Sequence, residues 1–132
     1  KHEAQRTQER TGILWRLQLP EQMPDIPSRT AVGLFRILQE ALTNVTRHAQ
    51  ATQMEIRLWQ EKDDLFLQVS DNGKGISPEA LSHAKSLGLL GMNERAALLG
   101  GEIKIERGES QGTVVTVRVP FSGSQTEVWD LP

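Results

Sequence analysis

The chain has 132 residues, enough for one domain with a sizeable core, and its 37% hydrophobic and 24% charged residues are typical of a soluble globular protein. A net charge of −2 with no cluster of Lys or Arg argues against nucleic acid as the main partner, and the lack of cysteine excludes disulfides and thiolate metal sites. No apolar run is long enough to span a membrane and the start of the chain has no signal core, so we expect a cytoplasmic chain without membrane contact of its own.

The first half of the chain predicts a strand and a long helix. Residues 1–12 are polar, helix-compatible up to about Arg10 and closed by Gly12, which predicts the end of a helix entering from an upstream segment. Apolar residues alternate over 13–19 and predict a half-buried strand. Ser28 is the predicted N-cap of a helix over 29–49. Steps of three and four predict a buried stripe on this helix, made of Val32, Phe35, Leu38, Ala41, Leu42, Val45 and Ala49.

The second half predicts two β-hairpins with helices between them. The expected segments are strands at 54–60 and 65–70, a short helix at 78–84, a helix at 93–99 that Gly100 ends, and strands at 102–107 and 113–119. Residues 121–132 are interpreted as a polar tail. The order of elements predicts a two-layer α/β sandwich, with helices on one face of a five-stranded mixed sheet.

The long helix carries a row of polar groups that suits phosphate chemistry. Glu40, Asn44 and His48 are spaced by four residues and share a helix face, with Arg47 beside Asn44. A carboxylate and an amide oxygen in this arrangement suit Mg²⁺ and the orientation of a nucleophile, while Arg47 or His48 suits phosphate oxygens. The same residues also fit the solvated face of an amphipathic helix, and the pattern alone leaves both interpretations open.

Glycines mark two further candidate segments. Asp71 ends an alternating strand and precedes Gly73 and Gly75, so its carboxylate can accept a hydrogen bond from an amine such as that of adenine while the glycines admit a flat ring. Residues 88–92 carry two glycines before a helix, where backbone amides suit phosphate and a lid can move. A tight turn and an ordinary connector are the respective alternatives. The spacing excludes a P-loop, a dinucleotide fingerprint and an EF-hand loop.

Taken together, these segments resemble the sequence boxes of the GHKL superfamily, which joins gyrase-type, chaperone and mismatch-repair ATPases with histidine kinases. Residues 35–44 with 47–49 resemble the N box, and residues 71–76 resemble the first glycine box. Residues 88–92 with 94–95 resemble the second glycine box, and 112–113 match a Gly-Thr pair near the adenine end of the site. The N box and the second glycine box are similar to the forms found in NarX- and DesK-like sensor kinases. The resemblance covers residues 13–120 and implies a catalytic ATP-binding domain of the Bergerat type.

The resemblance implies a role for each matched residue. Glu40 would orient or deprotonate an attacking imidazole, Asn44 would give an oxygen to the Mg²⁺ of ATP, and Asp71 would accept from the adenine amine. The remaining implied ligand contacts are Arg47 and His48 at the phosphates, Gly73, Gly75 and Thr113 around the base, and Gly88, Leu89, Gly91 and Met92 in the lid.

The implied activity is transfer of the ATP γ-phosphate to a histidine, as in two-component signalling. No histidine of the chain has a phosphoacceptor context, so we expect that residue on a dimerisation segment upstream of Lys1. The expected parent is a homodimer, compatible with an anchor in the bacterial inner membrane, and its downstream partner is a response regulator. Two alternatives stay open: an ATP hydrolase in which Glu40 activates water, and a nucleotide-binding module without chemistry, against which the intact Glu40, Asn44 and Asp71 argue.

Overall fold

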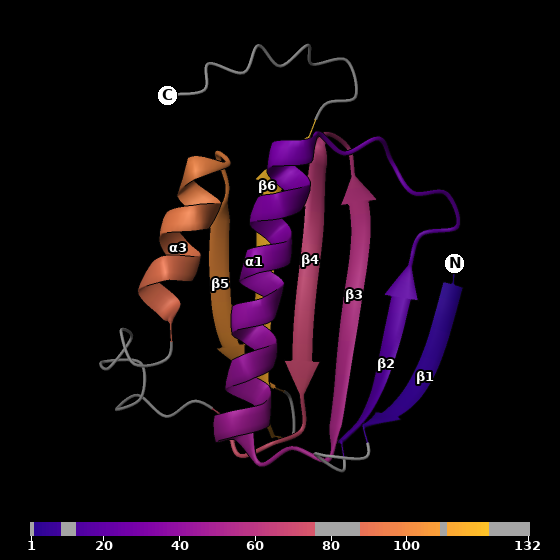
Figure 1. Ribbon diagram of the computed structural model, residues 1–132, viewed down its shortest axis with the longest axis vertical. Coiled ribbons are helices and arrows are strands. Elements are labelled where there is room, and N and C mark those ends of the chain that lie inside the picture. Colours follow the sequence, from indigo (N-terminus) through magenta and orange to yellow (C-terminus); the bar gives the residue numbers. More distant parts are fainter. Residues whose placement is uncertain (1, 9–12, 76–87, 109–110, 122–132) are drawn as a thin grey trace.

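The computed structural model describes residues 2–8, 13–75, 88–108 and 111–121, which form a two-layer α/β sandwich (Figure 1). The elements in chain order are β1 (His2–Gln8), β2 (Ile13–Leu19), α1 (Ser28–Asn44), the π-helical turn η1 (Val45–Ala49), β3 (Gln53–Glu61), β4 (Asp64–Asp71), α3 (Leu89–Leu98), β5 (Glu102–Arg107) and β6 (Thr113–Pro120). The helix predicted at 78–84 lies outside the described residues.

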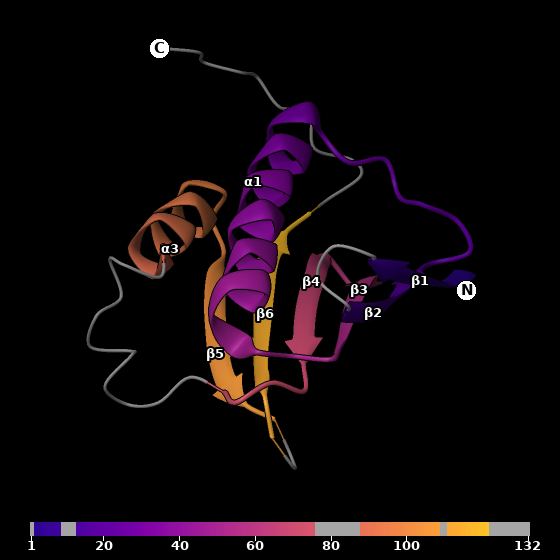
Figure 2. The same cartoon turned by 60° about the horizontal axis from the view of Figure 1, so that its bottom comes forward.

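The described strands form one six-stranded mixed sheet in the order β1-β2-β3-β4-β6-β5. Strands β2 and β3 are parallel neighbours joined through α1, as parallel pairing requires a crossover connection. All other neighbouring strands are antiparallel. Both α1 and α3 cover the same face of the sheet, as the rotated view makes plain (Figure 2). The predicted fold and its five strands are confirmed, and β1 adds a sixth.

The helix predicted over residues 1–12 is wrong for His2–Gln8, which is strand β1. This strand pairs antiparallel with β2, from His2 opposite Leu19 to Gln8 opposite Ile13. The backbone N–H and C=O groups of β2 that point away from β3 need partners, and β1 supplies them whatever its side chains are. Backbone pairing in the sheet therefore overrides the helix propensity of this polar segment.

The buried face of α1 is rotated relative to the predicted stripe. Leu34 and Ile37, which the prediction left out, are buried, whereas Val32 and Phe35 are 54% and 58% exposed. The members of the predicted stripe that do pack in or against the core are Leu38, Ala41, Leu42 and Val45. Apolar residues lie on more than one side of this helix, so their spacing alone does not select the face that meets the sheet.

Both ends of α1 depart from the predicted helix. Its N-cap is Pro27 rather than Ser28, which already belongs to the helix. At the other end the helix widens into η1, and the hydroxyls of Thr43 and Thr46 donate to the carbonyls of Gln39 and Thr43 at 2.9 and 3.1 Å. Threonine hydroxyls that bond back to helix carbonyls favour such local distortion.

Helix α3 begins at Leu89, four residues before its predicted start at Asn93. It ends as predicted at Gly100, whose φ of 80° is left-handed and whose N–H donates to the Ala97 carbonyl at 2.9 Å. The core extends one residue past the predicted boundary, because Phe121 is only 4% exposed. None of the helices in the described ranges is long and apolar enough to cross a membrane.

The orientation of α1 predicts that two alanine substitutions differ strongly in their effect on the free energy of unfolding. Ile37→Ala should lower the free energy of unfolding by about 2–5 kcal/mol, because Ile37 is 1% exposed and its removal leaves a cavity. Phe35→Ala, on the outward face, should change it by no more than about 0.5 kcal/mol. Urea unfolding of both variants measures the difference, and a larger loss for Phe35→Ala would contradict this orientation.

Candidate functional site

The candidate residues gather toward one end of the molecule, where α1 and β4 end and where α3 and β6 begin (Figure 1). Glu40 lies one turn before the end of α1, and Gly88 directly precedes α3. Asp71 is the last residue of β4, and Thr113 is the first of β6. The chain directions thus bring together residues that are far apart in the sequence.

Asp71 is half-buried on the helix-covered face of the sheet, because alternate residues of β4 are buried there. Its Oδ1 accepts a hydrogen bond from the Gly73 N–H at 2.8 Å, and the Thr113 N–H also bonds to this side chain. Burial raises the pKa of Asp71 by disfavouring the charged form, while the two backbone donors act in the opposite direction. The carboxylate is therefore fixed in direction and stabilised by any further donor.

Two glycines with positive φ pack the backbone tightly around Asp71. Gly112 has a φ of +94°, and a Cβ added to it would overlap the carbonyl oxygen of Asp71. Gly75 has a φ of +81°, and its Cβ would lie 3.0 Å from the Gly112 carbonyl oxygen. Only glycine combines this conformation with so close an approach. The predicted site glycine Gly75 therefore already has a role in backbone packing, whatever it contacts in a ligand.

Glu40 lies against the backbone of Gly88. A Cβ added to Gly88 would lie 2.5 Å from Glu40 Oε2, and the glycine has a left-handed φ of +72°. Gly88 is also the N-cap of α3, so the carboxylate lies at the helix end whose dipole favours negative charge. The structure therefore brings together two residues that the sequence placed in separate boxes.

The residues of the predicted polar row lie on two backbone elements, α1 and η1. Asn44 follows Glu40 by one α-helical turn and is half-buried. Arg47, which is exposed, and His48 belong to η1, where a π-helical turn replaces the α-helix. Hydrogen bonds in a π-helix join residues five apart, so the backbone after Asn44 departs from the α-helical spacing that the prediction assumed.

Three of the predicted lid residues belong to α3 itself. The side chains of Leu89 and Met92 are 3% and 0% exposed and lie in the core. The Met92 N–H donates to the Gly88 carbonyl at 3.0 Å as part of the helix. Gly91 lies in the first turn of the same helix. Only the backbone atoms of Leu89 and Met92 are therefore available to contact a ligand.

Asn72 is a structural contact of the site that the sequence prediction missed. Its Oδ1 accepts hydrogen bonds from the N–H groups of Thr52 and Gln53, each at 2.9 Å, and its Nδ2 donates to Thr52 Oγ1 at 2.9 Å. Gln111 Nε2 donates to the Asn72 carbonyl at 2.7 Å. Asparagine before a turn glycine often bonds to backbone, but its partners twenty residues earlier leave no local signal.

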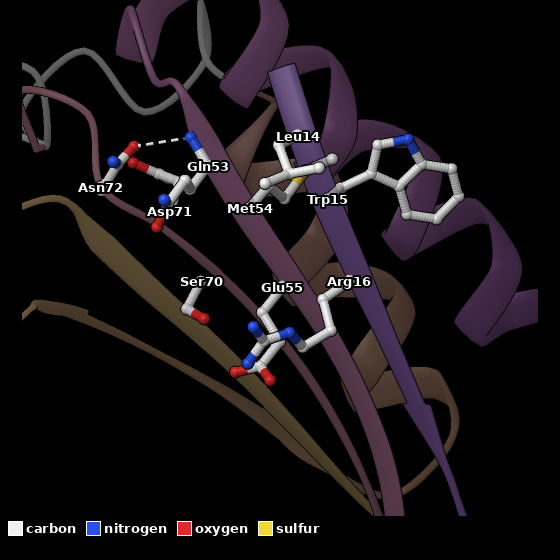
Figure 3. Close-up of a pocket in the computed structure, with 9 residues that line it drawn as sticks. All are labelled: Leu14, Trp15, Arg16, Gln53, Met54, Glu55, Ser70, Asp71 and Asn72. Atoms are coloured by element: carbon white, nitrogen blue, oxygen red, sulfur yellow. Dashed lines mark hydrogen bonds between the residues drawn. The ribbon is translucent and has the colours of Figure 1, made fainter. Parts of the chain in front are cut away.

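A hollow of about 260 Å³ also lies at these strand ends, and Asp71 is one of the residues that line it (Figure 3). Arg16, Glu55 and Ser70 form a row across β2, β3 and β4 by register. Strand alternation places this row on the face that the helices leave uncovered. Figure 3 shows Arg16 and Glu55 pointing toward one another. This row and the Glu40 side of Asp71 are thus on different faces of the sheet.

Comparison with protein families gives a match to residues 30–123, for the family described as "Histidine kinase-, DNA gyrase B-, and HSP90-like ATPase". The chain is 44% identical over 88 residues to the sensor histidine kinase LiaS of Bacillus subtilis, which is 67% of this chain and 24% of LiaS. It is 37% identical over 89 residues to the oxygen sensor histidine kinase NreB of Staphylococcus carnosus, covering 67% of this chain and 26% of NreB. The chain spans 17% to 30% of the length of such curated relatives.

Solved structures share the fold. The histidine kinase domain of a blue-light activated histidine kinase from Erythrobacter litoralis superposes with a TM-score of 0.68 at 25% identity, covering 80% of this chain and 51% of that one. The ATP-binding domain of PrrB from Mycobacterium tuberculosis superposes with a TM-score of 0.66 at 24% identity, covering 80% and 79%. The second likeness shows the fold alone.

The contact between Gly88 and Glu40 predicts that two neighbouring glycines respond differently to alanine. Gly88→Ala should lower the free energy of unfolding by about 1–2 kcal/mol, because it adds a Cβ to a left-handed residue and pushes against Glu40. Gly91→Ala should raise it by up to about 1 kcal/mol, because Gly91 is helical and its Cβ would meet only Arg95 Nη1, at 3.3 Å. Thermal or urea unfolding measures both, and equal losses would contradict the observed backbone at Gly88.

Proposed function

The chain belongs to the family of histidine kinase-, DNA gyrase B- and HSP90-like ATPases, and from this premise we propose that it is the ATP-binding catalytic domain of a two-component sensor histidine kinase. The proposed reaction transfers the γ-phosphate of ATP to a histidine on the dimerisation segment of the parent protein. Among the relatives with the highest similarity are sensor histidine kinases, which favours this activity within the family. The partners we propose are that segment, a second copy of the parent kinase and a downstream response regulator.

The observation that carries the proposal is the half-buried carboxylate of Asp71 beside the glycine-bearing segment. Two backbone N–H groups orient this side chain, and its raised pKa indicates that they compensate only part of its burial. An exocyclic amine that donates to the carboxylate would compensate more of that cost. Adenine presents an amine at this position and guanine presents a carbonyl, so Asp71 would select adenine nucleotides.

Glu40 is the residue we propose for the chemical step. A nitrogen of the attacking imidazole forms a bond to the γ-phosphorus, the bond from that phosphorus to the bridging oxygen breaks, and ADP leaves. The carboxylate of Glu40 orients the imidazole and accepts the proton that it loses. Glu40, on α1, is partly exposed beside the start of α3, which leaves its carboxylate accessible to a docked histidine segment.

Asn44 fits the role of a ligand to the Mg²⁺ that accompanies ATP. It offers a neutral amide oxygen, and Mg²⁺ commonly completes its octahedral shell with phosphate oxygens and water. The described residues contain no group of three or more His, Asp or Glu side chains that would hold a metal by themselves. When bound, Mg²⁺ would neutralise charge on the phosphates, while Arg47 and His48 are proposed as further phosphate contacts.

The first functional prediction concerns the base. Asp71→Asn should weaken ADP binding about ten- to a hundred-fold, because an acceptor carboxylate becomes a group that presents a donor amide, a loss of roughly 1.5–3 kcal/mol. Asp64→Asn is the matched control, since it changes the same residue type at the opposite end of β4, where Asp64 pairs with Arg118 at 3.3 Å. Calorimetry with ADP and GDP measures the effect. Equal affinity of the wild type for the two nucleotides would rule out Asp71 as the base reader.

The second functional prediction separates the kinase from a hydrolase. Glu40→Gln should leave ADP affinity nearly unchanged, because the carboxylate serves the nucleophile and not the nucleotide. It should slow histidine phosphorylation by about 10²- to 10⁴-fold, the usual contribution of a general base, in a protein that includes the dimerisation segment. Glu106→Gln, on the uncovered sheet face, should have no effect on either quantity.

The hydrolase alternative predicts a different pattern in the same experiments. The domain alone would then turn over ATP rapidly, and Glu40→Gln would abolish that turnover. The kinase proposal predicts very slow ATP hydrolysis by the domain and labelling of histidine only when the dimerisation segment is present.

A further inference from the structure

We propose that Asn72 is a positioning residue for adenine recognition, which acts by fixing the direction of the neighbouring Asp71 carboxylate. The inference rests on the proposed function and extends it to a residue that need not touch the nucleotide. Its basis is a set of hydrogen bonds that joins the segment after β4 to two other parts of the fold.

The first part of this set replaces the sheet ladder where it ends. The last pair between β3 and β4 is Met54 with Asp71. Beyond it, the Asn72 N–H donates to the Gln53 carbonyl at 3.2 Å, and its side chain bonds to both Thr52 and Gln53. The amide thereby uses both lone pairs of its oxygen and one of its two N–H donors.

The second part anchors Asn72 from both sides. The Thr52 carbonyl accepts a hydrogen bond from the Leu14 N–H at 3.0 Å. The segment to which Asn72 bonds, Thr52 and Gln53, is therefore itself bonded to β2. On the other side, Gln111 donates to the Asn72 carbonyl at 2.7 Å, one residue before the close approach of Gly112 to Asp71. Asn72 therefore connects the start of β3 to the turn that brings the Thr113 N–H to the Asp71 carboxylate.

The position of Asn72 in the chain explains why this set of bonds bears on Asp71. The turn in which Asp71 Oδ1 accepts from the Gly73 N–H spans Asn72. Rotation of the peptide group between Asn72 and Gly73 would move the Gly73 N–H away from the carboxylate. The hydrogen bond from Gln111 to the carbonyl of that peptide opposes the rotation. The side-chain bonds of Asn72 oppose a shift of the whole residue, because it would leave the N–H groups of Thr52 and Gln53 without their acceptor.

The test compares Asn72→Ala with a variant that removes a hydrogen bond elsewhere. Asn72→Ala should weaken ADP binding about ten-fold and reduce the preference for ADP over GDP by a similar factor, as loss of one charge-assisted hydrogen bond would. Competition by Mg²⁺-pyrophosphate should be unchanged, because the residues proposed to contact Mg²⁺ and phosphate, Asn44, Arg47 and His48, lie outside this segment. Gln68→Ala removes the bond from Gln68 Nε2 to Thr116 Oγ1 at 3.1 Å on the opposite face of β4, and should lower stability without altering nucleotide preference.

A double variant identifies the route of the effect. If Asn72 acts through Asp71, adding Asn72→Ala to Asp71→Asn should cause no further loss of preference for ADP. Additive losses would overturn the proposal. So would an Asn72→Ala protein that unfolds at lower temperature yet binds ADP and GDP as the wild type does.

Gln111→Ala keeps the test decisive if Asn72→Ala fails to fold. It removes only the bond to the Asn72 carbonyl and should shift the ADP preference in the same direction by a smaller factor, whereas an unchanged preference would overturn the inference. A wild type that binds no adenine nucleotide would instead overturn the proposed function, and this inference with it.

Discussion

The close approach of Gly112 to the carbonyl oxygen of Asp71 is the contact on which the candidate site depends. It requires a residue without a Cβ at a φ of +94°, and it brings the start of β6 against the end of β4. From this position the Thr113 N–H reaches the Asp71 carboxylate, and Gly75 packs on the Gly112 carbonyl. The end of β4, the start of β6 and Gly75 thus pack together around a single ionisable group.

Each of the two proposed functional carboxylates belongs to a residue that packs against a glycine with positive φ. Burial raises the pKa of Asp71 despite two backbone donors. A ligand amine that donates to the carboxylate would therefore offset part of the desolvation cost of its charged form. Glu40 lies at the N-terminus of α3, where the helix dipole favours its charge. In each case a glycine with positive φ, Gly112 or Gly88, makes room for the neighbouring group. The glycines of the boxes therefore shape the protein as well as any ligand pocket.

The sequence predicted what depends on local pattern. Alternation located the strands from β2 to β6, and residue types at fixed spacings identified Glu40 and Asp71 as candidates. It failed where tertiary contacts decide: the exposed Phe35 has the same helical spacing as buried residues, and the polar β1 is a strand only because β2 offers an edge. The hydrogen bonds of the Asn72 side chain could not be predicted, because its partner Thr52 is twenty residues away in the sequence.

The central claim is that an adenine nucleotide binds beside Asp71 on the helix-covered face of the sheet. Titration of the ¹⁵N-labelled domain with Mg²⁺-ADP tests this most directly, because NMR amide shifts report which face is occupied. The account predicts saturable shifts at Gly73, Gly75 and Thr113, and little change at Glu55 or at Trp59, which stacks on Phe66 on the uncovered face. Shifts centred on Arg16, Glu55 and Ser70, which form a row on that uncovered face, would contradict it.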